Sequence, residues 1–365
     1  MRTFLDSLRP WRQNYDWIAI VYVLVSGVYP LLNPSCFEQV AQPGPFHAPW
    51  PHLGWHALLA AVLYVVPPLL RRRPQWPLRL LGVIYLPLSM PLFYAELRFL
   101  GVVFFPYGQS FDPHLIALEQ WAFGFQPSLE WSRAWRWPWL LELMQFAYFS
   151  YYLFSAIALL LIWTTGKRTS DRNWALTAGL TRDLTAVMLS CYVWFVFFPV
   201  WGPKYFDYLG VAGTIASEGL HGWFFTDIMQ WLNSNAALHG AAFPSSHVAG
   251  SLVSWWWVWK VAPKHRWWLT ALWTLLGLSI VYCRYHYVVD LAAGIVWGTL
   301  VMWVAHRFLR LPAAGLRQPP LREQAPALQP VVLPMLQSEP GAEQADEQTV
   351  AADACRARSA NAHTP

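Results

Sequence analysis

Long apolar runs separated by short clusters of basic residues are the feature that most constrains this chain. Only 12% of its residues are charged, about half the share of a typical soluble domain. This composition excludes an ordinary soluble protein, and the many apolar and aromatic residues exclude a disordered one. A helix needs about 20 mostly apolar residues to cross a bilayer. We therefore predict an all-α, polytopic helical membrane protein of about eight spans, at residues 17–32, 55–70, 78–100, 138–163, 184–200, 246–261, 267–283 and 288–306.

The basic residues between these runs predict an orientation. Most of them fall on the side of the two termini, which the positive-inside rule assigns to the cytoplasm. The segments 33–54, 101–137 and 201–243 are then external, and the expected location is a bacterial inner membrane. In the second of these segments Leu115, Leu118, Trp121 and Ala122 have helical spacing, which predicts a helix that lies flat in the membrane interface. A net charge of +5 does not indicate nucleic acid as a partner, because the basic residues form short clusters and no continuous face.

Three polar stretches, residues 201–205, 243–250 and 282–290, fall on the predicted external side. Charged groups next to spans are costly there and become candidates for function. In the first, Lys204 is the only basic residue, although a lone lysine there can also snorkel to the interface. In the second, Ser245 or Ser246 precedes an apolar run and can cap a helix. The free N–H groups of that helix start would attract an anion, with His247 in the first turn. The bland alternative is a capped helix with an interfacial histidine.

The third stretch places His286 and Asp290 four residues apart, on one face of a helix. Asp290 can hold one imidazole nitrogen and leave the other free to attack phosphorus. A structural ion pair or two metal ligands would show the same spacing. Arg284 offers a planar fork for phosphate or an interfacial anchor. No Cys pair or His-Glu-x-x-His accompanies these residues, so we expect no metal at this site and no cofactor.

Together these stretches resemble the type 2 phosphatidic acid phosphatase superfamily. Its Pro-Ser-Gly-His motif corresponds here to Pro244-Ser245-Ser246-His247, and its His-x-x-x-Asp motif to His286-Tyr287-Val288-Val289-Asp290. The Gly-Pro-Lys-Tyr sequence at 202–205 and the Phe-Asp-Pro sequence at 111–113 resemble one branch of it, the inositol phosphorylceramide and sphingomyelin synthases and their bacterial, inositolphosphotransferase-like relatives.

The resemblance implies roles for seven residues. His286 would be the nucleophile, Asp290 its orienting partner and His247 the acid that protonates the leaving oxygen. The chain departs from the family pattern at Ser279-Ile280, where the family has Ser-Arg, so Arg284 is expected to substitute for that arginine. Lys204 also lacks a downstream Arg-Pro pair. The residues expected to hold phosphate are Lys204, Ser245, Ser246 and Arg284.

The same resemblance divides the chain into three parts. Residues 1–77 form N-terminal membrane helices, and residues 78–310 form a catalytic membrane domain with the six-helix core of the family. Residues 311–365 are rich in proline and lack sustained periodicity, which predicts a disordered cytoplasmic tail. Gly294 and Gly298 have the spacing of close helix packing, within the molecule first and between copies second. The sequence does not settle the oligomeric state.

The leading functional hypothesis is a lipid phosphatase or phosphotransferase that works through a phosphohistidine at the external face. Its substrate would be a phospholipid or prenyl phosphate, and its acceptor either water or a lipid alcohol. A transporter for lipids or small molecules is the alternative, with histidines relaying protons, and a non-catalytic scaffold is another. Polar residues inside the spans are few, chiefly Glu96, Glu142 and Gln145, which argues against a transport path. The intact His/His/Asp set argues against a scaffold.

Overall fold

The computed structural model describes residues 2–39, 48–105, 109–165, 171–205, 215–236 and 238–309. The regular structure in these ranges is helical, with no strand and one isolated parallel bridge, which confirms the all-α prediction. The predicted disordered tail, 311–365, lies outside the described residues. The α-helices are α1 (Arg2–Leu8), α2 (Asn14–Val28), α3 (Cys36–Gln39), α4 (Pro49–Arg71), α5 (Trp76–Leu100), α6 (Asp112–Phe123), α7 (Pro127–Ala134), α8 (Pro138–Phe149), α9 (Tyr151–Thr164), α10 (Asp171–Phe197), α11 (Phe224–Ala236), α12 (Ser246–Val261), α13 (Arg266–Tyr282) and α14 (Val288–Phe308).

Each of the eight predicted spans coincides with a helix or a pair of helices. Among the described residues, five helices are long and apolar enough to cross a membrane, namely α2 with its following turn, α4, α5, α10 and α14. The pair α8 and α9 adds a sixth if it counts as one bent span. Helices α12 and α13 have 16 and 17 residues, about 25 Å at 1.5 Å per residue, which is short of the bilayer core. The number of eight spans remains a prediction.

The fourth predicted span is not one straight helix. It breaks at Ser150, where α8 and α9 meet at 52°. The Ser150 hydroxyl donates a hydrogen bond to the carbonyl of Ala147 at 2.6 Å. A side chain that bonds to the helix's own carbonyls is a known cause of bends. The break brings Tyr148 and Tyr151, one on each side of it, against the ring of His247.

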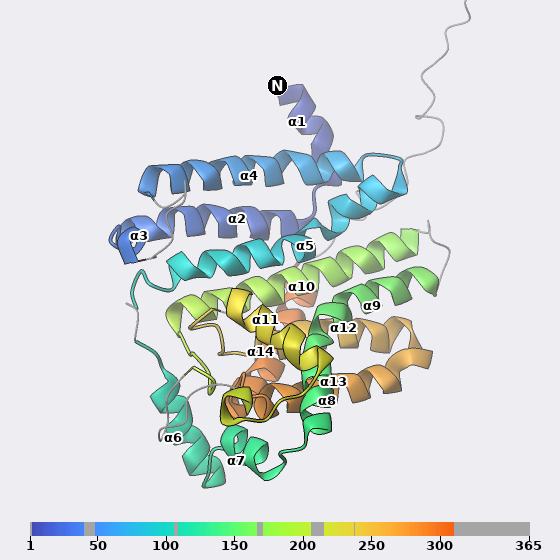
Figure 1. Ribbon diagram of the computed structural model, residues 1–365. Helices are drawn as coiled ribbons and strands as arrows, with labels where there is room; N and C mark the ends of the chain where they lie inside the picture. Colours follow the sequence, from blue (N-terminus) through green and yellow to red (C-terminus); the bar gives the residue numbers. More distant parts are fainter. Residues whose placement is uncertain are drawn as a thin grey trace, which may run out of the picture. The chain divides into compact units, whose positions relative to one another are not determined.

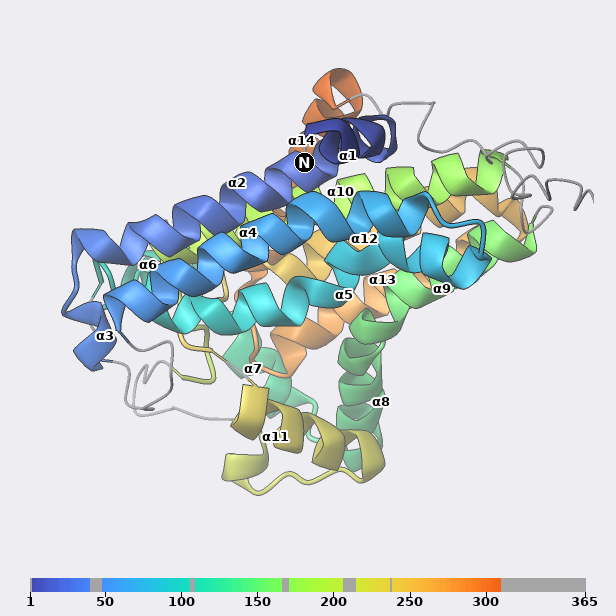
Figure 2. The same cartoon turned by 90° about the horizontal axis from the view of Figure 1, so that it is seen from above.

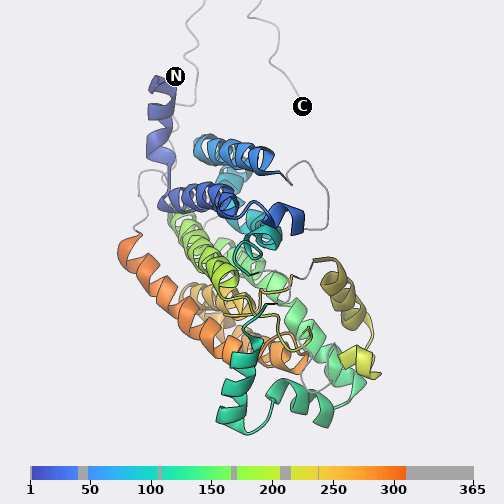
Figure 3. The ribbon, with the colours of Figure 1, turned by 90° about the vertical axis from the view of Figure 1, so that its left-hand side faces the viewer.

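Helices α4, α2, α5 and α10 lie side by side, as Figures 1 and 2 show. Helix α12 packs against α9, α10, α13 and α14, and Figure 3 shows α14 running along α10 and α12. Because α12 is surrounded by other helices, the residues at its N-terminus are buried.

Two glycines allow α14 to approach α12 closely. A Cβ on Gly294 would lie 2.7 Å from the carbonyl oxygen of Ser245, and one on Gly298 would lie 3.2 Å from the Cα of Ala249. Any larger side chain at Gly294 would push α14 away from the start of α12. The predicted packing within the molecule is therefore confirmed.

Candidate active site

Backbone contacts bring the three polar stretches together. The first and second meet where Val200 pairs with Ala241 and the N–H of Ala242 donates to the carbonyl of Val200 at 3.0 Å. The second meets the third where the N–H of Ser245 donates to the carbonyl of Asp290 at 3.0 Å. The second stretch thus joins the first and the third, which are about 80 residues apart in the sequence.

The two predicted catalytic histidines face each other. His286 follows α13 and is 3% exposed. Its Nδ1 lies 3.3 Å from the carboxylate of Asp290, and its Nε2 lies 3.4 Å from Nδ1 of His247 and 3.4 Å from the hydroxyl of Ser245. Burial lowers the pKa of His286 to about 3, and the positive charge of Lys204 acts in the same direction. His286 is therefore neutral at pH 7, with Asp290 at Nδ1 and the nitrogen Nε2 turned to the second histidine.

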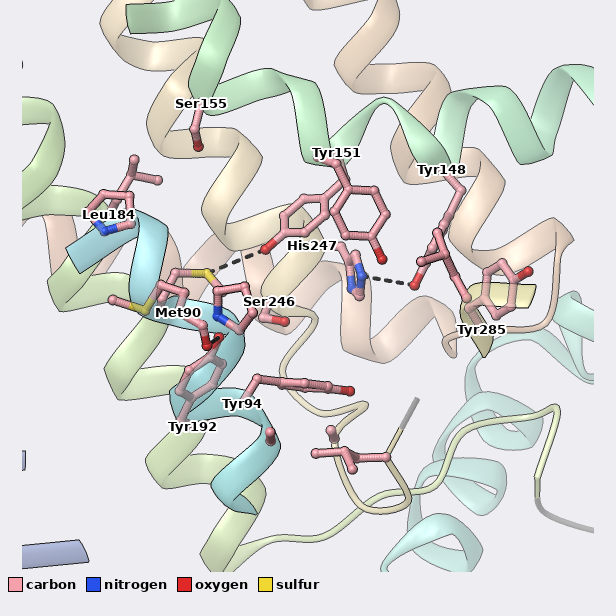
Figure 4. A pocket seen from close by; sticks show the side chains of 18 of the residues that line it. Met90, Tyr94, Tyr148, Tyr151, Ser155, Leu184, Tyr192, Ser246, His247 and Tyr285 are labelled. Atoms are coloured by element: carbon pink, nitrogen blue, oxygen red, sulfur yellow. Dashed lines mark hydrogen bonds between the residues drawn. The ribbon is translucent and has the colours of Figure 1, made fainter. Parts of the chain in front are cut away.

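His247 lies in the first turn of α12 and is fixed by two tyrosines. Its Nε2 is 2.9 Å from the hydroxyl of Tyr148, the contact drawn as a dashed line in Figure 4. The ring of Tyr151 packs against the imidazole at a centroid distance of 4.5 Å. The N-cap of α12 is Ser245, whose hydroxyl accepts from the N–H of Val248. The predicted capped helix start is thus present.

Lys204 is a buried cation with neutral neighbours. It is 9% exposed, its Nζ donates to the side-chain oxygen of Asn233 at 2.5 Å, and it lies over the rings of Tyr205 and Tyr285. Burial lowers the pKa of Lys204 to about 7. In the described part of the chain no carboxylate forms an ion pair with it. An incoming anion would supply the missing countercharge.

These groups form one end of a cavity of about 680 Å³. Lys204, Ser246, His247 and His286 line its polar end, and Figure 4 shows Ser246 and His247 among the surrounding tyrosines. Ser245 and Asp290 do not line the cavity themselves, but both contact His286, which does. Away from the histidines the cavity is mainly apolar, with walls from α5, α9 and α10 that include Pro87, Met90, Leu159, Leu184 and Met188.

The model of one protein family, described as the PAP2 superfamily, matches residues 113–305, which is more than half of the chain. The chain belongs to the PAP2 superfamily. All three polar stretches lie inside this match, so the superfamily resemblance inferred from them is confirmed. Helices α2, α4 and α5 lie outside it, although α5 lines the cavity. No curated protein and no solved structure matches the chain.

Lys204 gives this PAP2 superfamily member a testable pH dependence. With a pKa near 7, the ammonium is charged below neutrality and loses its proton as the pH rises, so anion binding should weaken. We expect the dissociation constant of sulfate to rise up to about tenfold per pH unit above pH 7. Sulfate keeps its charge over this range, so the protein alone titrates. Lys204→Arg should give a nearly flat profile because arginine stays charged, and equal slopes in both proteins would contradict this role.

The structure does not bring Arg284 to the other predicted phosphate ligands. Its guanidinium is fully buried and makes two 2.8 Å bonds to the carboxylate of Glu218 and one to the hydroxyl of Ser132. The Arg284 guanidinium is the main reason that the pKa of Glu218 is lowered. Arg284 is also not among the residues that line the cavity. In this geometry it joins the loop before α11 to the turn after α13.

Two carboxylates on α6 support the site and were not identified from the sequence. Asp112 is buried and accepts from the N–H groups of Trp201 and Gly202 at 2.7 and 2.9 Å, and from the hydroxyl of Tyr287 at 2.9 Å. Glu119, also buried, accepts from the first N–H groups of α14. Burial raises the pKa of Glu119 to about 7. Helix α6 therefore links the first polar stretch to the third.

Helix α6 confirms the helical spacing predicted in this segment, and its flat position in the membrane interface remains a prediction, but its buried polar face was not predicted. The spacing of Leu115, Leu118 and Trp121 predicted an apolar face that lies flat in the membrane interface. In the structure Leu118 and Trp121 are exposed, whereas Asp112, Leu115, Ile116 and Glu119 are buried. The seven-residue spacing of the two acids, which puts them on one face, was the available signal.

Asp112→Ala should destabilise the protein strongly. The change leaves two backbone N–H groups and a tyrosine hydroxyl buried without their acceptor, and each costs about 1–3 kcal/mol. We expect a loss of about 3–5 kcal/mol in the free energy of unfolding, measured in detergent. Asp112→Asn is the matched control, because its carbonyl oxygen keeps one or two of these bonds and should lose less. Equal stability of the Ala variant and the native protein would contradict the bracing role of α6.

Proposed function

We propose that this protein is an integral membrane enzyme that transfers the phosphate or phospho-head-group of a lipid through a phosphohistidine at His286. Membership of the PAP2 superfamily and the apolar helices are consistent with a membrane lipid phosphatase. The observation that carries the proposal is the cavity, which joins two histidines and a lysine at one end to apolar walls along the rest. The polar end would suit the charged head group of a lipid, and the apolar walls would suit its chain.

In the first step, Nε2 of His286 attacks phosphorus and the bond from phosphorus to the leaving oxygen breaks. His247, which takes up a proton when the negative charge of the phosphate binds beside it, gives that proton to the leaving oxygen, which departs as an alcohol. The carboxylate of Asp290 lies next to Nδ1 of His286. It orients the ring and stabilises the positive charge that the ring acquires. Lys204 and the N–H groups at the start of α12 neutralise the phosphoryl oxygens.

In the second step, an acceptor oxygen attacks phosphorus and the phosphorus–nitrogen bond breaks. His247, now neutral, takes the proton from the acceptor and returns to its starting state. Water as the acceptor gives a phosphatase, and a lipid alcohol gives a phosphotransferase. The likeness of the Gly-Pro-Lys-Tyr stretch to the synthase branch favours transfer, whereas the roomy cavity admits either acceptor.

Helix α5 is proposed to hold the lipid chain. It contributes Pro87, Leu88, Pro91 and neighbouring residues to the apolar wall, and it lies outside the family match. The choice among lipids would then depend on residues specific to this chain. We further propose that the cavity's polar end faces the external side, as the distribution of basic residues indicates.

The test uses purified protein in liposomes. Phosphatidic acid, a prenyl pyrophosphate and phosphatidylinositol are supplied in turn, with and without ceramide or diacylglycerol as acceptor. Free phosphate and new phospholipids are measured together, for the native protein and His247→Gln. Free phosphate identifies a phosphatase, and a new phospholipid that needs the added alcohol identifies a transferase.

His247→Gln should slow either reaction about 10²- to 10⁴-fold, the usual contribution of a general acid. A turnover that is unchanged in this variant would contradict the proposed mechanism. If none of these lipids reacts while radiolabelled lipid crosses the liposome membrane, the transporter hypothesis replaces the enzyme.

A further inference from the structure

A second cluster of reactive side chains lies outside the family match, near the ends of α4 and α5 that adjoin the predicted external loops. It consists of His52 and His56 on α4 and Glu96 on α5, and one ligand atom from each lies within 4.8 Å of the others. Both histidines are buried. Four residues apart on a helix, they share one face and turn toward the same neighbour.

The backbone holds one nitrogen of each ring. Nδ1 of His56 lies 2.8 Å from the carbonyl of His52, to which it can donate, and Nε2 is in contact with the carboxylate of Glu96. Nε2 of His52 lies 3.3 Å from the carbonyl of Ser26. Histidines that bind metals are usually oriented in this way, with one nitrogen on a carbonyl and the other on the ion.

The neighbouring helix α2 contacts the cluster closely through a glycine and a tyrosine. A Cβ on Gly27 would lie 2.5 Å from the Cβ of His56, so only glycine lets this histidine sit so close to α2. The ring of Phe37 packs edge-on against His52. The hydroxyl of Tyr22 is buried, interacts electrostatically with Glu96 and has no hydrogen-bond partner among the described residues. A buried, unpaired hydroxyl next to these groups points to a missing ion or water.

We propose that His52, His56 and Glu96 bind one divalent transition-metal ion, with zinc as the ion that suits them best. Two imidazoles and one carboxylate are a common protein ligand set for zinc, and a water molecule completes the four positions. That water would also give the Tyr22 hydroxyl a partner. The His56–Glu96 ion pair involves two of the three groups, whereas a metal ion would use all three.

The proposed ion would connect α4 to the wall of the cavity. In the sequence of α5, Glu96 stands between Ala95 and Arg98, and both of these neighbours line the cavity. Zinc would therefore fix the external end of α5, next to the space assigned above to the lipid chain. The metal site itself does not depend on the proposed function, because its ligands are separate from His247 and His286.

The experiment measures metal content in the full-length protein, purified without a histidine tag. We expect about one zinc per chain by elemental analysis, and less than about one tenth of that in His52→Gln, His56→Gln and Glu96→Gln. His306→Gln is the matched control, since His306 also pairs with a carboxylate, that of Asp183 at 2.7 Å, but has no third ligand among the residues that the structure describes. It should keep its zinc, as should His286→Asn.

A second measurement uses only the native sequence, so it does not depend on how the variants fold. Zinc is removed with a chelator, and Co²⁺ is added. The visible absorption of four- or five-coordinate Co²⁺ should appear, saturate near one equivalent and disappear on addition of zinc. Absence of zinc in the purified protein together with absence of this absorption would overturn the proposal, as would equal metal binding by the native protein and His52→Gln.

Discussion

Replacing His286 by asparagine is expected to reduce kcat/KM at least about 10⁴-fold on whichever lipid is turned over. The nucleophile of a covalent mechanism has no substitute, and loss of such a residue in other enzymes costs 10⁴- to 10⁶-fold. The asparagine amide keeps a polar side chain of similar width but has no lone pair that can attack phosphorus. Initial rates of phosphate or phospholipid release would be compared at equal amounts of folded protein.

The control for this variant is His114→Asn, because His114 is an exposed histidine on α6 whose ring contacts Phe111 and which does not line the cavity. Its rate should stay within about twofold of the native protein. If His286→Asn kept more than about one tenth of the native rate, another group would have to be the nucleophile, and the assignment of His286 would be withdrawn.

Asp290→Asn should lower kcat about 10³-fold or more while leaving KM nearly unchanged. The carboxylate lies 3.3 Å from Nδ1 of His286 and accepts the N–H of Tyr287 at 2.9 Å. Asparagine keeps the backbone bond, so the fold should hold. One carboxylate oxygen, Oδ2, makes both contacts, so the asparagine oxygen takes its place and the change removes the negative charge that stabilises the charged ring. The same exchange beside a catalytic histidine costs about 10⁴-fold elsewhere.

The split between kcat and KM separates positioning from substrate binding. Asp183→Asn is a matched control, because Asp183 on α10 also holds a histidine, His306, but is not among the residues that line the cavity. Per folded molecule its activity should be close to native. A loss in Asp290→Asn that appears in KM alone would mean that the carboxylate acts on binding, contrary to the mechanism.

The helices could be predicted because they depend on local information. Each of the eight apolar runs chosen as a span is a helix or a pair of helices in the structure. The bend at Ser150 could not be found in this way, since it depends on one hydroxyl that bonds to Ala147. The buried face of α6 was missed for a similar reason, because the acceptors Asp112 and Glu119 are defined by partners about 90 to 175 residues away.

The residues of the site were likewise predictable from the sequence only where a local motif contains them. His247, His286 and Asp290 stand in short motifs whose spacing carries the chemistry, so they could be named from the sequence. Arg284 was assigned to phosphate by its planar fork and as a substitute for the arginine of the family motif, and the structure pairs it with Glu218, which no local pattern connects to it. The His52-x-x-x-His56 spacing was visible in the sequence, but only the packing of α5 supplies Glu96.

The most direct test of the phosphohistidine is to trap it. The native protein and His286→Asn would be mixed with phosphatidic acid or phosphatidylinositol that carries ³²P, and then denatured in alkali within one turnover. We expect a label on the native protein that is stable in alkali, is lost in acid and maps to the peptide containing His286. Turnover without any such label, or an equal label on His286→Asn, would contradict the covalent mechanism.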